Sequence, residues 1–404
     1  MANIFLLDID GVLVKPGGYR TALHRTISYF LEQLGLPDYF NLSEEEIGTF
    51  EANGITSEWD MIPLTFATLF DQALCNKKIY LPSLRQAIEW FRNEKPVIQR
   101  PSYVANIPEW LSMGVPGLPL ADALYVRLQQ SPEDLPFRNL ASQPFAVEIL
   151  GNTRDFSANP FSRLFQNQVL GKTLFTQYYP TLPAIQVEST LENYDEANLE
   201  PALQQELKKQ IESGKIQAAA MTLRPNWVEN ISSNGNSCRA GFSPEAEIAI
   251  NICGLEGIPL AGYGTLLWAC ERYQLAIDQI LKPSEFHALA AIALTFMDFA
   301  NALHLTMKLY DPNYGITQKE TSLSLTNFHP EEPLHIHIFE DSPNGIRSVI
   351  RASEILKKAG WPVSLNLWGI TDHPQKKKAL QDLGATVFKT TNEALVTALE
   401  MIRD

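Results

Sequence analysis

From residue 215 onward, short apolar segments alternate with helical segments, and this alternation most constrains how the chain can fold. The strand-like segments include KIQAAAM, LHIHIFED, VSLNLWGIT and ATVFKT, and a helical pattern lies between each and the next. Strands that alternate with helices predict a parallel sheet. The apolar segment at residues 4–9 reads as a buried strand of the same sheet. We therefore expect an α/β fold, with a Rossmann-like parallel sheet core and helices on both faces.

A long, mostly helical segment, residues 15–214, separates this first strand from the rest of the predicted sheet. Apolar residues at helical spacing predict helices here, and the prolines between residues 94 and 139 predict packed loops and short helices. Because strands before and after the segment belong to one sheet, it is an insertion. We expect two domains: a Rossmann-like sheet core at 1–14 and 215–404, and a large, mainly helical inserted domain at 15–214.

Composition excludes several classes of protein. The formal net charge of −14 and the pI near 5.0 argue against general binding to nucleic acid or to an anionic membrane. The four cysteines show no CxxC spacing, so we expect no zinc site. So few cysteines in a chain of this length suggest a reducing cytoplasm. The N-terminus has no basic segment before its apolar run, so we expect no signal peptide. No pattern predicts an oligomeric state.

The best candidate for a membrane segment is EFHALAAIALTFMDFANALHLTM, which begins at Glu285. It carries His287, Asp298, Asn301 and His304, polar groups that a lipid-facing helix would avoid. We therefore predict one long helix buried in a soluble core, and no membrane partner.

Polar residues gather where the predicted strands end and where this long helix begins. Ligands of parallel sheets bind beyond the carboxyl ends of the strands, so we expect these side chains on one rim. The residues concerned are Asp8, Asp10 and Gly11, then Thr222, Leu223 and Arg224, then Lys282, and finally Glu340 and Asp341.

This set of side chains suits the transfer of a phosphoryl group. A carboxylate can attack phosphorus only when the negative charge of the phosphate is neutralised. We predict Asp8 as the nucleophile that forms an aspartyl-phosphate, and Asp10 as the group that protonates the leaving oxygen and then deprotonates water. Lys282 would add a point positive charge close to the phosphate.

The remaining residues would bind the phosphate and a metal ion. The Thr222 hydroxyl and the backbone N–H groups of Leu223 and Arg224 would hold phosphate oxygens, with the Arg224 side chain as a further contact. Gly11 would let the backbone approach the phosphate closely. Carboxylates and water are the ligands that Mg²⁺ prefers. The predicted magnesium ligands are Asp8, Asp10, Glu340 and Asp341.

These motifs together resemble the haloacid dehalogenase-like superfamily of aspartyl-phosphate hydrolases. The matching elements are DIDGVL, the strand-end Thr222, Lys282-Pro283 before a helix, and EDSPNGI. The resemblance implies a Mg²⁺-dependent phosphatase in which Asp10 marks the phosphate-ester branch. It also implies a cap inserted after strand one that selects a small phosphorylated metabolite. The Pro-rich middle of the cap and residues 311–333 depart from the family pattern.

Two alternatives use the same motifs. A sugar phosphomutase would exclude water and return the phosphoryl group to its substrate. A binding or regulatory protein would keep the fold without turnover.

A separate pair, His335 and His337, lies on one face of a predicted strand and could bind a metal. We interpret these two histidines as core residues instead.

Overall fold

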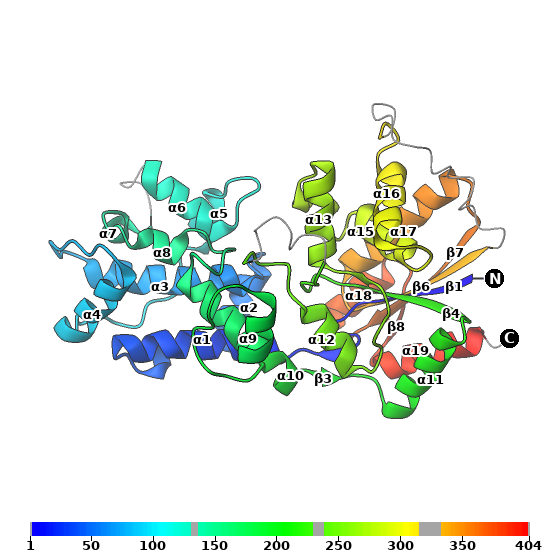
Figure 1. Ribbon diagram of the computed structural model, residues 1–404, viewed down its shortest axis with the longest axis horizontal. Helices are drawn as coiled ribbons and strands as arrows, with labels where there is room; N and C mark the ends of the chain where they lie inside the picture. Colours follow the sequence, from blue (N-terminus) through cyan, green and yellow to red (C-terminus); the bar gives the residue numbers. More distant parts are fainter. Residues whose placement is uncertain (1, 131–135, 229–237, 315–332, 403–404) are drawn as a thin grey trace. The chain divides into compact units, whose positions relative to one another are not determined.

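The computed structural model describes residues 2–130, 136–228, 238–314 and 333–402 (Figure 1). Contacts divide the chain into two compact units. The sheet unit comprises Met1–Pro16, Asp195–Ser233 and Gly241–Asp404. The helical unit comprises Gly17–Tyr194 and Asn234–Ala240.

The sheet unit contains six strands that all pair in parallel, as the alternating pattern predicts. Their order across the sheet is β5-β4-β1-β6-β7-β8. Together with the helices around it, this sheet confirms the expected α/β fold. The strands are β1 (Ala2–Leu7), β4 (Ile216–Met221), β5 (Leu260–Ala261), β6 (Leu334–Glu340), β7 (Val363–Ile370) and β8 (Thr386–Phe388).

The strand order reverses at β1, the first strand in the sequence. From β1 the chain order runs outward through β4 to β5 on one side, and through β6 and β7 to β8 on the other. Open parallel sheets bind ligands in the crevice beyond the strand ends at such a reversal. The carboxyl ends of β1, β4 and β6 are therefore where a site is expected.

Side chains of the central strands alternate between two apolar layers. Phe5 and Leu7 pack with one set of helices, and Ile4 and Leu6 pack with another set on the opposite face. Both faces of the sheet are thus covered (Figure 1). The first set is α11 (Pro201–Glu212), α12 (Glu245–Ile252) and α19 (Thr391–Met401), and the second is α15 (Glu285–Leu294), α16 (Phe299–Tyr310), α17 (Pro343–Lys358) and α18 (Pro374–Gln381).

The apolar stretch from Glu285 forms two helices, so the prediction of one long helix is wrong. Between α15 and α16 the chain breaks, and the Asp298 carboxylate accepts a hydrogen bond from the backbone N–H of Asn301 at 3.2 Å. An aspartate in this position caps a new helix.

Among the described residues, no helix combines the length and the apolar character needed to cross a membrane. Two further helices of the sheet unit are α13 (Tyr263–Tyr273) and α14 (Ile277–Ile280).

The two histidines of β6 belong to the sheet layers. His337 is 2% exposed, and its ring lies 4.8 Å from that of Phe5 and stacks on Trp368. Burial lowers the pKa of His337 to about 4, so the ring is neutral. The ring of His335 bonds the Ser364 hydroxyl at 2.7 Å on the neighbouring strand. His337 is therefore a core residue, as interpreted, whereas His335 is only partly buried.

The return to the sheet unit comes earlier than the predicted boundary at residue 214. The chain re-enters the sheet unit at Asp195, and β3 (Glu196–Ala197) pairs antiparallel with β2 (Val14–Lys15). Helix α11 follows, and its Leu207 is fully buried in the same apolar layer as Phe5. The amphipathic pattern of this helix predicts a buried face, but the pattern does not say which core receives it.

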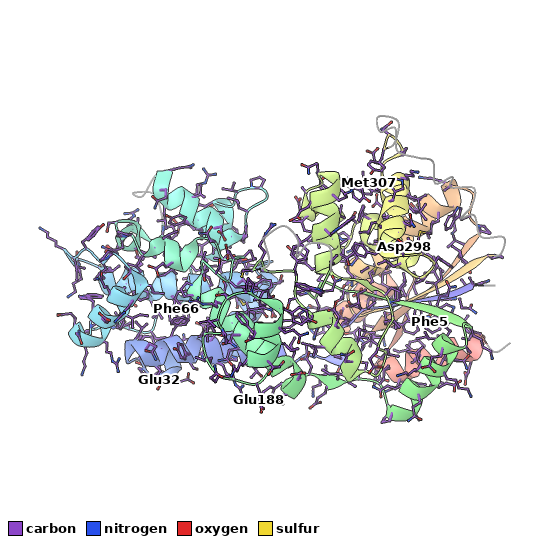
Figure 2. All side chains as sticks on the ribbon, in the orientation of Figure 1. Phe5, Glu32, Phe66, Glu188, Asp298 and Met307 are labelled. Carbon is purple, nitrogen blue, oxygen red and sulfur yellow. The ribbon has the colours of Figure 1, made fainter. Side chains whose placement is uncertain are left out.

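The helical unit has an aromatic core. The rings of Phe30, Phe66 and Phe161 lie 4.2–5.5 Å apart between centroids, and Phe66 is labelled among the helices in Figure 2. Its Pro-rich part contains short helices between loops, as predicted. The helices are α1 (Gly18–Leu34), α2 (Glu44–Ala52), α3 (Glu58–Leu74), α4 (Leu84–Glu94), α5 (Ile107–Ser112), α6 (Leu120–Gln130), α7 (Arg138–Ala141), α8 (Ala146–Leu150), α9 (Pro160–Tyr178), α10 (Thr190–Tyr194) and a 3₁₀ turn (Asp38–Phe40).

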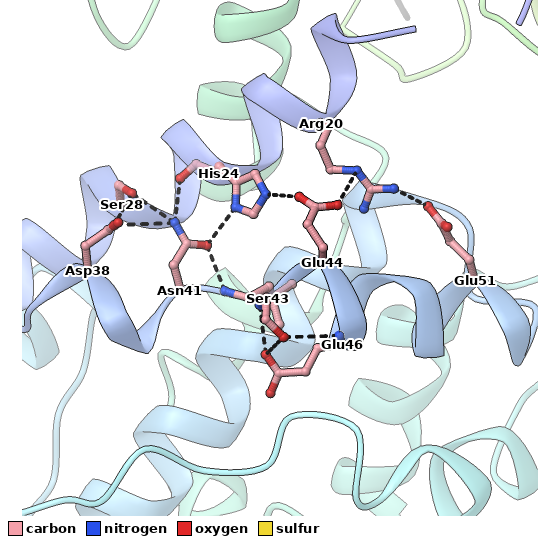
Figure 3. Close-up of polar contacts among 10 residues, drawn as sticks. Arg20, His24, Ser28, Asp38, Asn41, Ser43, Glu44, Glu46 and Glu51 are labelled. Atoms are coloured by element: carbon pink, nitrogen blue, oxygen red, sulfur yellow. Dashed lines mark hydrogen bonds and ion pairs between the residues drawn. The ribbon is translucent and has the colours of Figure 1, made fainter. Parts of the chain in front are cut away.

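A polar network joins α1 to α2 (Figure 3). The ring of His24 bonds Glu44 at 2.9 Å and Asn41 at 3.3 Å. At the start of α2, the Ser43 hydroxyl accepts from the Glu46 N–H, and the Glu46 carboxylate accepts from the Ser43 N–H. This reciprocal cap satisfies two backbone donors that the first helical turn leaves unpaired.

Candidate active site

Asp8 lies directly after β1, at the reversal of the strand order. Its backbone N–H donates to the carbonyl of Phe339 at 3.0 Å, which ties it to the end of β6. The residue is only 7% exposed. Burial of an ionised carboxylate lowers the stability of the folded protein unless a partner offsets its charge, so the neighbours of Asp8 matter for both stability and charge.

Lys282 supplies a partner for Asp8 from the segment before α15. Its Nζ lies 3.0 Å from Oδ1 of Asp8 and 2.7 Å from Oε2 of Glu340. Burial alone would lower the pKa of Lys282, but the two carboxylates outweigh that effect and raise it. The lysine is therefore a buried, protonated ammonium between two strand ends.

Three carboxylates meet at this point. One oxygen each from Asp8, Glu340 and Asp341 lies within 4.8 Å of the others. Burial raises the pKa of Asp8 well above its usual value, and repulsion from Glu340 adds to the effect, whereas Lys282 opposes it. Burial also raises the pKa of Asp341. The buried Lys282 ammonium contacts two of these three acids, Asp8 and Glu340.

The loop after β6 fixes the Glu340 side chain. Its Oε1 accepts from the backbone N–H of Ser342 at 3.1 Å and from the Ser342 hydroxyl at 2.8 Å. Its Oε2 occupies the space beside Gly345, where a Cβ atom would lie only 1.7 Å away. Glycine at this position is therefore required by the placement of the carboxylate.

Lys376 also contacts this cluster, although no motif in the sequence pointed to it. Its Nζ lies 2.7 Å from Oδ2 of Asp341, and the lysine side chain is 49% exposed. The residue belongs to a run of three lysines in α18, a pattern typical of a solvated helix face. An exposed ammonium on one carboxylate is easily displaced by a stronger cation.

The Asp10 carboxylate is directed to Arg224, so the prediction that it joins the magnesium ligands does not match this geometry. Nε of Arg224 lies 3.1 Å from Oδ1 and 3.0 Å from Oδ2 of Asp10, and Nη2 lies 2.5 Å from Oδ1. The three clustered carboxylates are those of Asp8, Glu340 and Asp341. These hydrogen bonds to the guanidinium direct the Asp10 carboxylate away from that cluster.

Arg224 is buried rather than exposed to a phosphate, contrary to its predicted role as a side-chain contact. Its side chain is 1% exposed, and Nη1 donates to Oδ2 of Asp195 at 2.7 Å. Asp195 has a side chain that is 0% exposed, and no motif in the sequence pointed to it. The guanidinium therefore bridges two carboxylates.

The predicted phosphate-binding backbone lies at the end of β4. Thr222 is 1% exposed, and its hydroxyl accepts a hydrogen bond from the Arg224 N–H at 3.1 Å. That N–H is thus engaged within the loop, contrary to its predicted role as a phosphate donor. Leu223, between them, is 50% exposed. Gly11 has a φ of 77°, and a Cβ there would lie 3.1 Å from Oδ2 of Asp341, so its backbone runs close to the acidic cluster.

Comparisons with known proteins bear on the fold. No family model and no curated protein matches the chain. A crystal structure determined as a target of the Northeast Structural Genomics Consortium is similar, with a TM-score of 0.57 and 12% sequence identity. The match covers 100% of this chain and 99% of that one. At this identity the similarity shows the fold alone.

Proposed function

We propose that the protein is a Mg²⁺-dependent phosphatase of the haloacid dehalogenase-like type. One observation carries the proposal: Asp8, Glu340 and Asp341 cluster at the carboxyl ends of β1 and β6, and Lys282 contacts the first two. Ligands bind beyond the strand ends at a reversal of the strand order. Carboxylates that can hold a metal ion, with an ammonium beside them, suit the transfer of a phosphoryl group there.

The three clustered carboxylates fit a magnesium ion. Their oxygens lie within 4.8 Å of one another, and burial raises the pKa values of Asp8 and Asp341, so a cation that offsets the negative charge of these carboxylates would be favoured. All are hard oxygen donors of the kind that Mg²⁺ prefers. When bound, the ion would neutralise phosphate charge beside Asp8. The hydrogen bonds from Ser342 and Lys282 already hold the Glu340 carboxylate beside Asp8.

The reaction would have two steps. First, the Asp8 carboxylate attacks phosphorus, and the bond between phosphorus and the ester oxygen breaks. Asp10 gives its proton to that leaving oxygen. Second, Asp10 takes a proton from water, and the resulting hydroxide attacks the phosphorus on Asp8. Inorganic phosphate leaves, and both carboxylates return to their starting states. Lys282 stays protonated and offsets the negative charge of the transferring group.

The proposed substrate is a small phosphorylated metabolite, and the proposed location is the cytoplasm. The acidic composition supports a small ligand over nucleic acid. The large helical unit is inserted between β1 and β4, which is the position of a substrate-selecting cap in the family that the motifs resemble.

The test is phosphate release from p-nitrophenyl phosphate and a panel of small phosphate esters, with Mg²⁺ and with EDTA. We expect release that needs the metal and is lost in Asp8→Asn. Asp298→Asn, which keeps a good helix cap, serves as the matched control and should retain wild-type rates. Absence of release from every ester would overturn the phosphatase. Phosphoryl exchange between sugar phosphates without free phosphate would identify a mutase instead.

A further inference from the structure

We infer that Asp195 is a positioning residue for the reaction: through Arg224 it fixes the direction of the Asp10 carboxylate. This inference rests on the proposed function, because it concerns the group that serves the leaving oxygen. The observation behind it is a chain of three hydrogen-bonded side chains, Asp195–Arg224–Asp10, of which the first two are buried.

The guanidinium is held at both ends. Nε and Nη2 bind Asp10 on one edge, and Nη1 binds Asp195 on another. The side chains of Arg224 and Asp195 are 1% and 0% exposed, whereas that of Asp10 is 39% exposed. The two buried members thus form a support, and the more accessible carboxylate at its end is the one that can meet a substrate.

The backbone of Arg224 is fixed independently of Asp195. Its N–H donates to the Thr222 hydroxyl at 3.1 Å, and its carbonyl accepts from the Tyr263 N–H at 2.9 Å. What Asp195 controls is therefore the far end of the side chain. Arginine suits this task because its planar fork engages two carboxylates in fixed directions, which a lysine ammonium does not do.

Asp195 and Asp10 are also joined through the backbone. The strand after Asp195, β3, pairs with β2, and the N–H of Asn198 donates to the carbonyl of Leu13 at 2.8 Å. Asp10 itself forms a β-bridge with Val14, the first residue of β2. The loop that carries Asp10 is therefore bridged to β2, and Asp195 directly precedes β3, the strand that pairs with β2.

Leaving-group dependence tests this role. Protonation matters little when p-nitrophenolate departs, because that anion is already a good leaving group, but it matters greatly for an alkyl alcohol. For Asp195→Asn we expect a loss in kcat/KM, which reports the step in which the leaving group departs, on the order of 10-fold or more with an alkyl phosphate, and a much smaller loss in kcat/KM with p-nitrophenyl phosphate. Asp10→Asn should show the same selectivity, and Asp298→Asn should show none.

Arg224→Lys provides a second variant if Asp195→Asn folds poorly. It keeps the positive charge and loses the fork, so we expect the same selective loss. An equal loss on both esters in the folded variants would mean a structural role and would overturn the inference, while leaving the phosphatase intact if Asp8→Asn is inactive. Activity that survives in Asp8→Asn, or no activity in the wild type, would overturn the proposed function and this inference with it.

Discussion

Nζ of Lys282 lies 3.0 Å from Oδ1 of Asp8, and this contact joins the segment before α15 to the end of β1. The same ammonium contacts Glu340 at 2.7 Å. Because all three side chains are at most 11% exposed, water screens their charges poorly. The site and the stability of the sheet unit therefore depend on the same few charges.

Replacing Lys282 by methionine should destabilise the metal-free protein strongly. The change leaves Asp8 and Glu340 buried without their counter-ion, and removal of one partner from a buried pair costs about 3–5 kcal/mol. Urea unfolding at neutral pH in EDTA would measure it. Lys15→Met is the control, since Lys15 is 73% exposed and pairs only at the surface with Glu196. Equal, small effects of both variants would contradict the account.

The metal-free protein should lose stability as the pH rises. Burial raises the folded-state pKa of Asp8 above 3.8, its usual value, so the folded state holds this proton more tightly than the unfolded chain. The stabilisation is present in full below that usual value and is lost as the pH rises through the raised pKa. Asp341 contributes with the same sign.

Magnesium should counter this loss, because it stabilises the ionised carboxylates. We expect thermal unfolding scans to show a larger rise in Tm on adding Mg²⁺ at pH 8 than at pH 5. Asp8→Asn should reduce the rise at pH 8. A rise of the same size at both pH values, or in the variant, would argue that the ion binds elsewhere.

Gly345→Ala should disturb Glu340 specifically. The new Cβ would lie 1.7 Å from Oε2, so the carboxylate or the start of α17 must move. Overpacking of this kind costs about 1–3 kcal/mol. Chemical denaturation and Mg²⁺ titration by calorimetry should both show weakening. Gly48→Ala in α2 is the matched control, since nothing lies within 4 Å of its added methyl, and it should be neutral or slightly stabilising. Unchanged magnesium binding in Gly345→Ala would remove Glu340 from the proposed ligands.

Glu247 in α12 should make a second contribution to the pH dependence. Its Oε1 accepts from the Trp227 N–H at 2.9 Å, and its Oε2 is buried with no hydrogen-bond partner in the described structure. Burial raises the pKa of Glu247 from 4.5 to about 7. Stability is therefore lost as the pH rises from 4.5 through about 7.

The variant Glu247→Gln cannot ionise and keeps an oxygen for the Trp227 N–H. It should unfold at a higher temperature than the wild type at pH 8, and at nearly the same temperature at pH 4.5. Glu212→Gln, at an exposed position of α11, should shift neither value. A gain that does not depend on pH would mean that the carboxyl is not the cause.

The strand ends could be predicted because their signal is local. An apolar run that stops at Asp8 or Glu340 predicts both the strand and the edge of the sheet to which its last residue belongs. The meeting of Asp8, Glu340 and Asp341 follows from that rule. Asp195 could not be found in this way, because it follows a short helix and its partner, Arg224, is close only in the folded chain.

Other differences have similar causes. The apolar faces of α11 and of the helices in the helical unit look alike in sequence, so the pattern could not assign α11 to the sheet. The break between α15 and α16 did leave a local signal, since Asp298 three residues before Asn301 is a typical N-cap arrangement. Apolar continuity across residues 285–307 outweighed that signal in the prediction.

The position of β1 in the chain has a consequence during synthesis. Ala2 pairs with Leu334 and Asn3 pairs with Ile216, so β1 has no neighbour in the sheet until those later strands have been made. On the ribosome, residues 17–194 emerge in full before either partner strand of β1 does. The helical unit can therefore begin to fold before β1 has a strand to pair with. A nascent chain that ends before Leu334 holds Asp8 on a strand with one edge open, and the acidic cluster is among the last features of the molecule to form.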